Sequence, residues 1–328
     1  MISLGSRNAL LVALTSSSLC FFGCSSSDEP GHDPSSAGTG SQYAGSDSGG
    51  AIDSGDDVAG AGGTIEPGEN AGGAAGAAGT ANESKGHSFS IKFDYRFDRA
   101  GYFDAPERRA ALEAAAANWS AVLANDFPGV PAGTKLTLTD PEDRDQQVTV
   151  ESLEEDIDDL LVFVGTSEAI TGYGRGGPAG LAETSDAALQ QSFFARQTGK
   201  VFQPWAGSIS FKGSIDYFFD ESPGTRGDIP KNKYDFISLA THELGHVLGF
   251  ASCPPFIALE DGETFVGDAA VAAYGGPVPL EADFGHLAEG TESDGVEALM
   301  TPKLINGVRR FPTTLDIATL LDIGYAAK

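Results

Sequence analysis

The order of apolar and polar positions predicts alternating strands and helices from residue 88 onwards. Between Ser88 and Phe97 the two kinds of side chain alternate, as they do in a half-buried strand. The segment Ala105–Ala124 is rich in alanine and has Pro106 near its start, so it predicts a helix. Further strands are predicted at Lys135–Asp140, at Asp159–Gly165 and within Trp205–Phe219. This order favours an α/β (α+β) fold with a mixed, twisted sheet and a backing helix.

A glycine-rich stretch, Gly172–Thr184, interrupts this pattern. It opens no helix and contains neither GxGxxG nor GK[ST], so it does not predict phosphate binding. We expect a loop that leads into an edge strand at about Ala179–Glu183.

The clearest helical periodicity lies just before residue 250. Asp235 can cap this helix, and one broad arc of it is apolar: Phe236, Ile237, Ala240, Leu244, Val247 and Leu248. The segment His242–Ser252 reads HELGHVLGFAS, which places His242 and His246 one turn apart on another face. Gly249 follows, and glycine accepts the positive φ of a sharp helix end.

These residue types match the chemistry of a zinc hydrolase. Two histidines at this spacing can bind one zinc ion without bending the helix, and Glu243 beside them can take a proton from a water that the metal activates. Such sites take three protein ligands, so a third must lie elsewhere. Ser252 stands where the pattern HExxHxxGxxH would place it, but a neutral hydroxyl is a poor donor. Of the five histidines in the chain, only His286 lies downstream of the helix.

The motif HELGHVLGF, followed by an inserted segment and by DFGHLAEGTESDGVEALMTP, resembles the metzincin clan of zinc peptidases, and within it the leishmanolysin-like arrangement. In that arrangement the third histidine lies beyond an insertion and precedes a methionine turn. The resemblance therefore implies His286 as the third ligand and Met300 as an apolar floor beneath the metal. It is close over 234–250 and 286–325 and only architectural over 88–219.

The resemblance also implies an architecture. The catalytic domain, 85–328, would have an upper subdomain at about 85–250, a lower one at about 251–328, and a closing helix within Thr313–Tyr325. Substrate would lie in the cleft between the subdomains, as a strand added to the upper edge strand.

Two other sources of the third ligand remain open. A glutamate would complete the site as in gluzincins, which nominates Glu260, Glu263 or Glu281. An aspartate would complete it as in aspzincins, which nominates Asp283.

Composition separates the first quarter of the chain from the rest. Arg7 and the apolar run Ala9–Leu14 predict a secretory signal peptide over residues 1–24. Cys24 and the residues before it resemble a lipobox, which implies acylation and a tether to the bacterial cell envelope; otherwise the protein would be secreted. Residues 25–84 contain mostly glycine, alanine, serine and acids, so they predict a disordered linker.

The formal net charge of -27 and the lack of a basic stripe exclude nucleic acid as a partner. The acid clusters DPEDRD and EEDIDD could hold calcium, although they lack the spacing of a calcium loop. Only three cysteines are present, so Cys253 has no disulfide partner within the domain and is expected to be a buried thiol.

Together these features predict an exported zinc endopeptidase that acts on protein or peptide substrates. The alternative is a non-catalytic, adhesin-like surface lipoprotein that keeps the fold and the metal for stability. Glu243 favours the enzyme, because a purely structural zinc site gains nothing from a general base.

Overall fold

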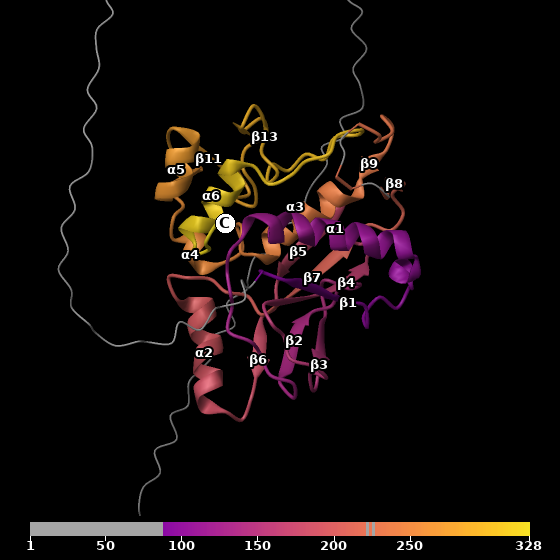
Figure 1. Cartoon of the computed structure of the whole chain (residues 1–328), viewed down its shortest axis with the longest axis vertical. Coiled ribbons are helices and arrows are strands. Elements are labelled where there is room, and N and C mark those ends of the chain that lie inside the picture. Colours follow the sequence, from indigo (N-terminus) through magenta and orange to yellow (C-terminus); the bar gives the residue numbers. More distant parts are fainter. Residues whose placement is uncertain (1–87, 221–222, 225–226) are drawn as a thin grey trace, which may run out of the picture. The chain divides into compact units, whose positions relative to one another are not determined.

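The computed structural model describes residues 88–220, 223–224 and 227–328 (Figure 1). The predicted signal peptide with Cys24 and the predicted linker lie outside these described residues. Among the described residues, none of the helices is both long and apolar enough to cross a membrane.

The largest sheet of the described residues is a mixed sheet of four strands (Figure 1). Its order is β1 (Ile91–Asp94), β4 (Leu160–Thr166), β7 (Ala206–Phe211) and β5 (Gly174–Pro178). The first three strands are parallel, and β5 runs antiparallel to β7 at the edge. The predictions of strands at 88–97, 159–165 and 205–219 are therefore confirmed, and so is a mixed α/β fold.

A second, smaller sheet has the order β3 (Gln147–Val150), β2 (Lys135–Thr139) and β6 (Leu181–Glu183). Helix α2 (Ala187–Thr198) follows β6, with Asp186 as its N-cap. One edge of the main sheet is β5, which lies inside the stretch predicted to be a loop. The strand expected at 179–183 is instead β6 in the smaller sheet. Sequence reasoning missed β3 and α2, which are short or only weakly amphipathic.

Two helices cover one face of the main sheet, α1 (Pro106–Val122) and α3 (Phe236–Val247), close to the ranges predicted for them. They lie against each other, and two side chains of α1 bond to Thr241 of α3. The Asn118 amide donates to the Thr241 hydroxyl at 3.0 Å, and the Trp119 indole donates to the Thr241 carbonyl at 2.8 Å. Because Trp119 is fully buried, this contact fixes α3 against the core.

The rest of the described residues form short elements joined by irregular segments. These elements are η1 (Tyr102–Asp104), β8 (Tyr217–Phe218), β9 (Tyr234–Asp235), α4 (Pro254–Ile257), β10 (Thr264–Phe265), α5 (Asp268–Tyr274), β11 (Val278–Pro279), β12 (Glu292–Ser293), β13 (Val296–Glu297) and α6 (Thr314–Asp322). Helix α6 lies within the range predicted for a closing helix.

The largest apolar core is continuous across residue 250. It joins Trp119 and Ile209 of the sheet side to Leu287, Met300 and Leu315 of the later segments. A division into subdomains at 85–250 and 251–328 stays a prediction. Cys253 is buried in this core as a free thiol, as expected, and burial raises its pKa to about 12.

Candidate metal centre

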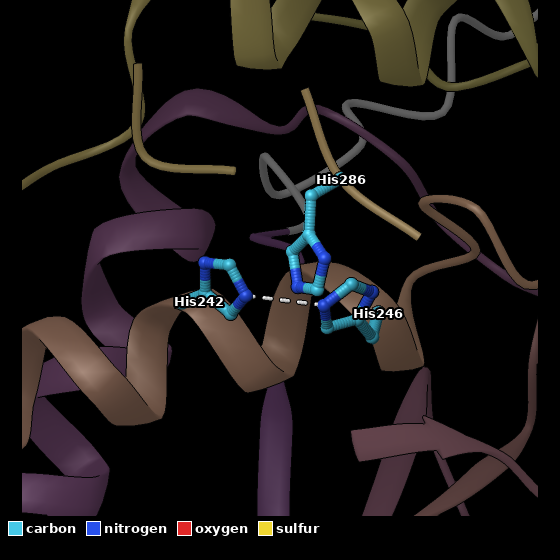
Figure 2. Close-up of side chains that lie close together, drawn as sticks. All are labelled: His242, His246 and His286. Carbon is cyan, nitrogen blue, oxygen red and sulfur yellow. Dashed lines mark hydrogen bonds between the residues drawn. The ribbon is translucent and has the colours of Figure 1, made fainter. Parts of the chain in front are cut away.

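Helix α3 presents two of the three histidines. Asp235 caps its N-terminus by accepting hydrogen bonds from the amide and hydroxyl of Ser238 at 3.0 and 2.6 Å. One turn separates His242 and His246, so their rings lie on the same side of the helix, with centroids 4.9 Å apart (Figure 2). The capped, buried helix therefore sets the spacing of this pair.

The helix ends as the sequence predicts. Gly249 has a φ of +111°, and a Cβ atom there would lie 2.6 Å from Cδ1 of Phe202, so both the backbone and the packing require glycine. The Gly249 amide donates to the His246 carbonyl and the Phe250 amide to the Gly245 carbonyl, which is a Schellman motif. This turn brings the Phe250 carbonyl to Nδ1 of His246 at 3.2 Å.

His286 comes from the irregular segment after β11, yet its ring lies beside the other two (Figure 2). Ring centroids are 5.3 Å from His242 and 5.1 Å from His246. One nitrogen from each of the three rings lies within 4.8 Å of the others. The three histidines that the sequence nominated thus converge.

The proton positions of this group favour a cation. His242 Nδ1 lies 2.8 Å from the Leu299 carbonyl, and His246 Nδ1 contacts the Phe250 carbonyl. A carbonyl only accepts, so each Nδ1 carries the proton, and in the neutral ring Nε2 carries a lone pair. The two Nε2 atoms are 3.1 Å apart, which without a cation between them brings two lone pairs together.

The spacing also fits a tetrahedral ion. Two nitrogens that each lie about 2.1 Å from such an ion are about 3.4 Å apart, close to the separation of the two Nε2 atoms. The wider spread of 4.8 Å across the group means that a ring must turn slightly when an ion binds.

Burial keeps the rings of His242 and His246 neutral. The three histidines are between 1% and 5% exposed. Burial, followed by the charges of His246 and His286, lowers the pKa of His242 well below 6.5. Burial, followed by the charge of His286, lowers the pKa of His246 to about 3. Neutral imidazole is the form that binds metals, so the two rings are prepared for that role near pH 7.

Ser252 and the acidic candidates take other places. The Ser252 hydroxyl donates to the His246 carbonyl at 2.7 Å and so caps the end of α3. Asp283 lies outside the group, with a carboxylate oxygen 3.9 Å from Nδ1 of His286. Among the described residues, the only group of three or more potential ligands is the histidine group, which leaves out Glu260, Glu263 and Glu281. Within the described part of the chain, the carboxylates of DPEDRD and EEDIDD likewise form no group of three potential ligands.

Glu243 lies against the edge strand of the main sheet. It is fully buried. A Cβ atom at Gly174 of β5 would lie 2.5 Å from its Oε1 atom, and one at Gly176 would collide with its carbonyl oxygen. These two of the three glycines in β5 therefore let α3 approach closely enough to place this carboxylate beside the strand.

Met300 packs against α3 at Gly245, between His242 and His246 in the chain. It is fully buried, and a Cβ atom at Gly245 would lie 2.5 Å from its sulfur. Sequence reasoning missed the group that holds this segment, the carboxylate of Asp316, which accepts the amides of Leu299 and Met300. The spacing Thr313-x-x-Asp316 before an apolar run is a capping signal that could have drawn attention to it.

The fold and the site define a mixed α/β protein with a buried group of three histidines that could hold a metal ion. Comparisons with the models of known protein families and with curated proteins found no match for this chain.

Proposed function

We propose that this chain is an exported zinc endopeptidase. The observation that carries the proposal is the convergence of three buried histidine rings, with the buried Glu243 next to His242 in the chain. Nitrogen donors of this kind suit zinc, copper, iron or nickel, and a set of three with a fourth position left to water is usual for hydrolytic zinc. The HExxH spacing at 242–246 supports zinc among these metals.

His242, His246 and His286 would hold the ion. When bound, zinc supplies a Lewis acid and a water whose pKa is lowered towards 7. The Nδ1 contacts of His242 and His246 to carbonyls fix the tautomer in which each Nε2 carries the lone pair that can bind metal.

Glu243 would carry the proton. Its backbone is fixed by α3, and its carboxylate is buried beside β5, away from bulk water. A carboxylate in such a place can accept a proton from the attacking water and deliver it to the leaving amine of the peptide.

Strand β5 would bind the substrate. It lies at the edge of the main sheet and pairs with β7 on one side. A peptide that joins the other side would form main-chain hydrogen bonds, which accept many sequences. Since Glu243 lies against the same strand, a peptide bound there would pass close to the proposed base.

The test is hydrolysis of an unfolded protein by the zinc-loaded domain. Glu243→Ala should keep zinc and fold but lose about 10²- to 10⁴-fold in hydrolysis rate, since a general base contributes that much. A protein that binds zinc but hydrolyses nothing would favour the alternative, a non-catalytic surface protein. Full activity in the Glu243→Ala protein would refute the role of Glu243.

Export and tethering through Cys24 belong to the same proposal and rest on the N-terminal sequence. If Cys24 is acylated, the protein should enter the detergent-rich phase on phase separation, while Cys24→Ser should stay in the aqueous phase. Hydrolysis by the released domain should be the same in both. Equal partitioning of the two proteins would remove the lipid anchor from the proposal.

A further inference from the structure

Asp316 lies at the start of α6, fully buried, and its carboxylate accepts four hydrogen bonds. Three reach Oδ2, from the Thr313 amide at 2.8 Å, the Thr313 hydroxyl at 2.7 Å and the Leu299 amide at 2.9 Å. The fourth reaches Oδ1 from the Met300 amide at 3.0 Å. The carboxylate therefore caps its own helix and also binds the amides of Leu299 and Met300, which are distant from it in sequence.

The peptide unit between Leu299 and Met300 connects this carboxylate to His242. Its N–H, which belongs to Met300, donates to Asp316, and its C=O, which belongs to Leu299, lies 2.8 Å from Nδ1 of His242. A negative charge on the N–H side polarises the unit, so its oxygen becomes a stronger acceptor. The chain of contacts runs from Asp316 through one peptide unit to the ring.

The same turn also holds the third histidine. The Met300 carbonyl accepts the amide of Leu287, the residue next to His286, at 3.0 Å. His246 is held differently, because its Nδ1 contacts the Phe250 carbonyl in the turn after α3. In the part of the chain that the structure describes, no carboxylate accepts the amide of Ala251, which completes that peptide unit.

We propose that Asp316 is a positioning residue of the metal site, which orients and strengthens His242 as a ligand through the Leu299–Met300 peptide unit. The inference rests on the proposed metal site and deepens it. The competing explanation is that Asp316 only caps α6. The two explanations differ in what happens at the metal when the carboxylate loses its charge.

Asp316→Asn separates them. The amide oxygen of the asparagine can take the place of Oδ2 and keep three of the four hydrogen bonds. The NH2 group then faces the Met300 amide, and because both groups are donors, no hydrogen bond forms between them. The variant thus breaks the link to His242 while it keeps most of the cap. Thr313→Ala is the matched control, because it removes a cap hydroxyl and leaves the Met300 bond in place.

We expect Asp316→Asn to bind zinc about 10- to 100-fold more weakly, the usual effect of losing a group that supports a ligand. In the cobalt(II)-substituted protein its visible absorption bands should shift. Thr313→Ala should unfold at a lower temperature but keep the zinc affinity and the cobalt spectrum. Affinities are measured by chelator competition on protein shown to be folded by near-UV circular dichroism.

A folded Asp316→Asn protein with the wild-type affinity and cobalt spectrum would overturn the inference and leave the metal site standing. A wild-type protein that binds no zinc would overturn both. If Asp316→Asn does not fold, the wild-type protein decides: in its zinc form, the Nδ1 proton of His242 should resonate further downfield than that of His246. The opposite order, or equal shifts, would overturn the inference.

Discussion

The two halves of the candidate metal centre are built in different ways. His242 and His246 lie on one capped helix, and the helical repeat alone sets their spacing. His286 lies in an irregular segment between β11 and β12, whose position depends on hydrogen bonds to residues distant in sequence. The position of His286 depends on more distant contacts than the positions of His242 and His246. We therefore expect the site to be more sensitive to substitutions around His286 than to substitutions in α3.

The largest expected effect tests whether His286 belongs to the site at all. His286→Ala should lower zinc affinity by about 100-fold or more, because each ligand of a zinc site contributes several kcal/mol of binding free energy. Hydrolysis of an unfolded protein should be lost with it. Chelator competition and a peptidase assay on the same preparation measure both quantities.

Ser252→Ala is the control for that variant, since Ser252 occupies the place of a third histidine in the uninterrupted pattern. Its hydroxyl only caps the His246 carbonyl, so zinc affinity should stay within a few-fold of wild type. A larger loss of affinity in Ser252→Ala than in His286→Ala would reverse the assignment.

The second prediction concerns the contact between Arg309, in the segment before α6, and Asp235 at the start of α3. The Arg309 guanidinium is fully buried and donates to both carboxylate oxygens of Asp235, the N-cap of α3, and to Asp220. Arg309→Met leaves two buried carboxylates without this cation and should lower the free energy of unfolding by about 3–5 kcal/mol. Urea denaturation measures the change.

Lys233→Met is the matched control for Arg309→Met. The ammonium of Lys233 lies 2.9 Å from Asp216, but this pair is exposed, so its loss should cost less than about 1 kcal/mol. Similar losses in the two variants would mean that the Arg309 contact does not anchor α3.

The third prediction concerns pH. In the metal-free protein the pKa of His246 is about 3, below its value near 6.5 in an unfolded chain, so the unfolded state binds more protons between these values. The contribution of His246 to the free energy of unfolding is therefore fully present above about pH 6.5, and it is lost as the pH falls below that value. Between pH 6.5 and 5.0 His246 alone should account for about 2 kcal/mol.

Urea denaturation of the metal-free wild-type protein and of the metal-free His246→Gln variant, at a series of pH values, measures how the free energy of unfolding changes with pH. The variant should show a shallower loss of stability over the same range. An identical slope in the two proteins would mean that His246 is not held neutral by the fold.

The sequence predicted the parts of this molecule whose signals are local. The arc of apolar residues from Phe236 to Leu248 specified α3, and Gly249 specified its end, because a positive φ restricts the residue type at one position. His286 could be nominated because the chain contains so few histidines. These inferences needed residue types and spacing alone, and not a knowledge of which distant residues are in contact.

The rest depended on tertiary contacts. Strand β5 has a sequence typical of a loop, GRGGP, and becomes a strand because its glycines admit α3 beside it and β7 pairs with it. The role of Asp316 requires the fold to bring α6 against Leu299 and Met300. A single sequence does not show which distant backbone amides meet a carboxylate.

The groups that hold His242 and His246 in place are main-chain carbonyls, those of Leu299 and Phe250. Every amino acid supplies such an oxygen, so these two positions are constrained only by the size and apolar character of their buried side chains. The contacts that hold His242 and His246 can therefore tolerate extensive substitution while their geometry persists. Side-chain motifs in a sequence do not reveal these two carbonyl contacts, whereas the backbone geometry around His242 and His246 does.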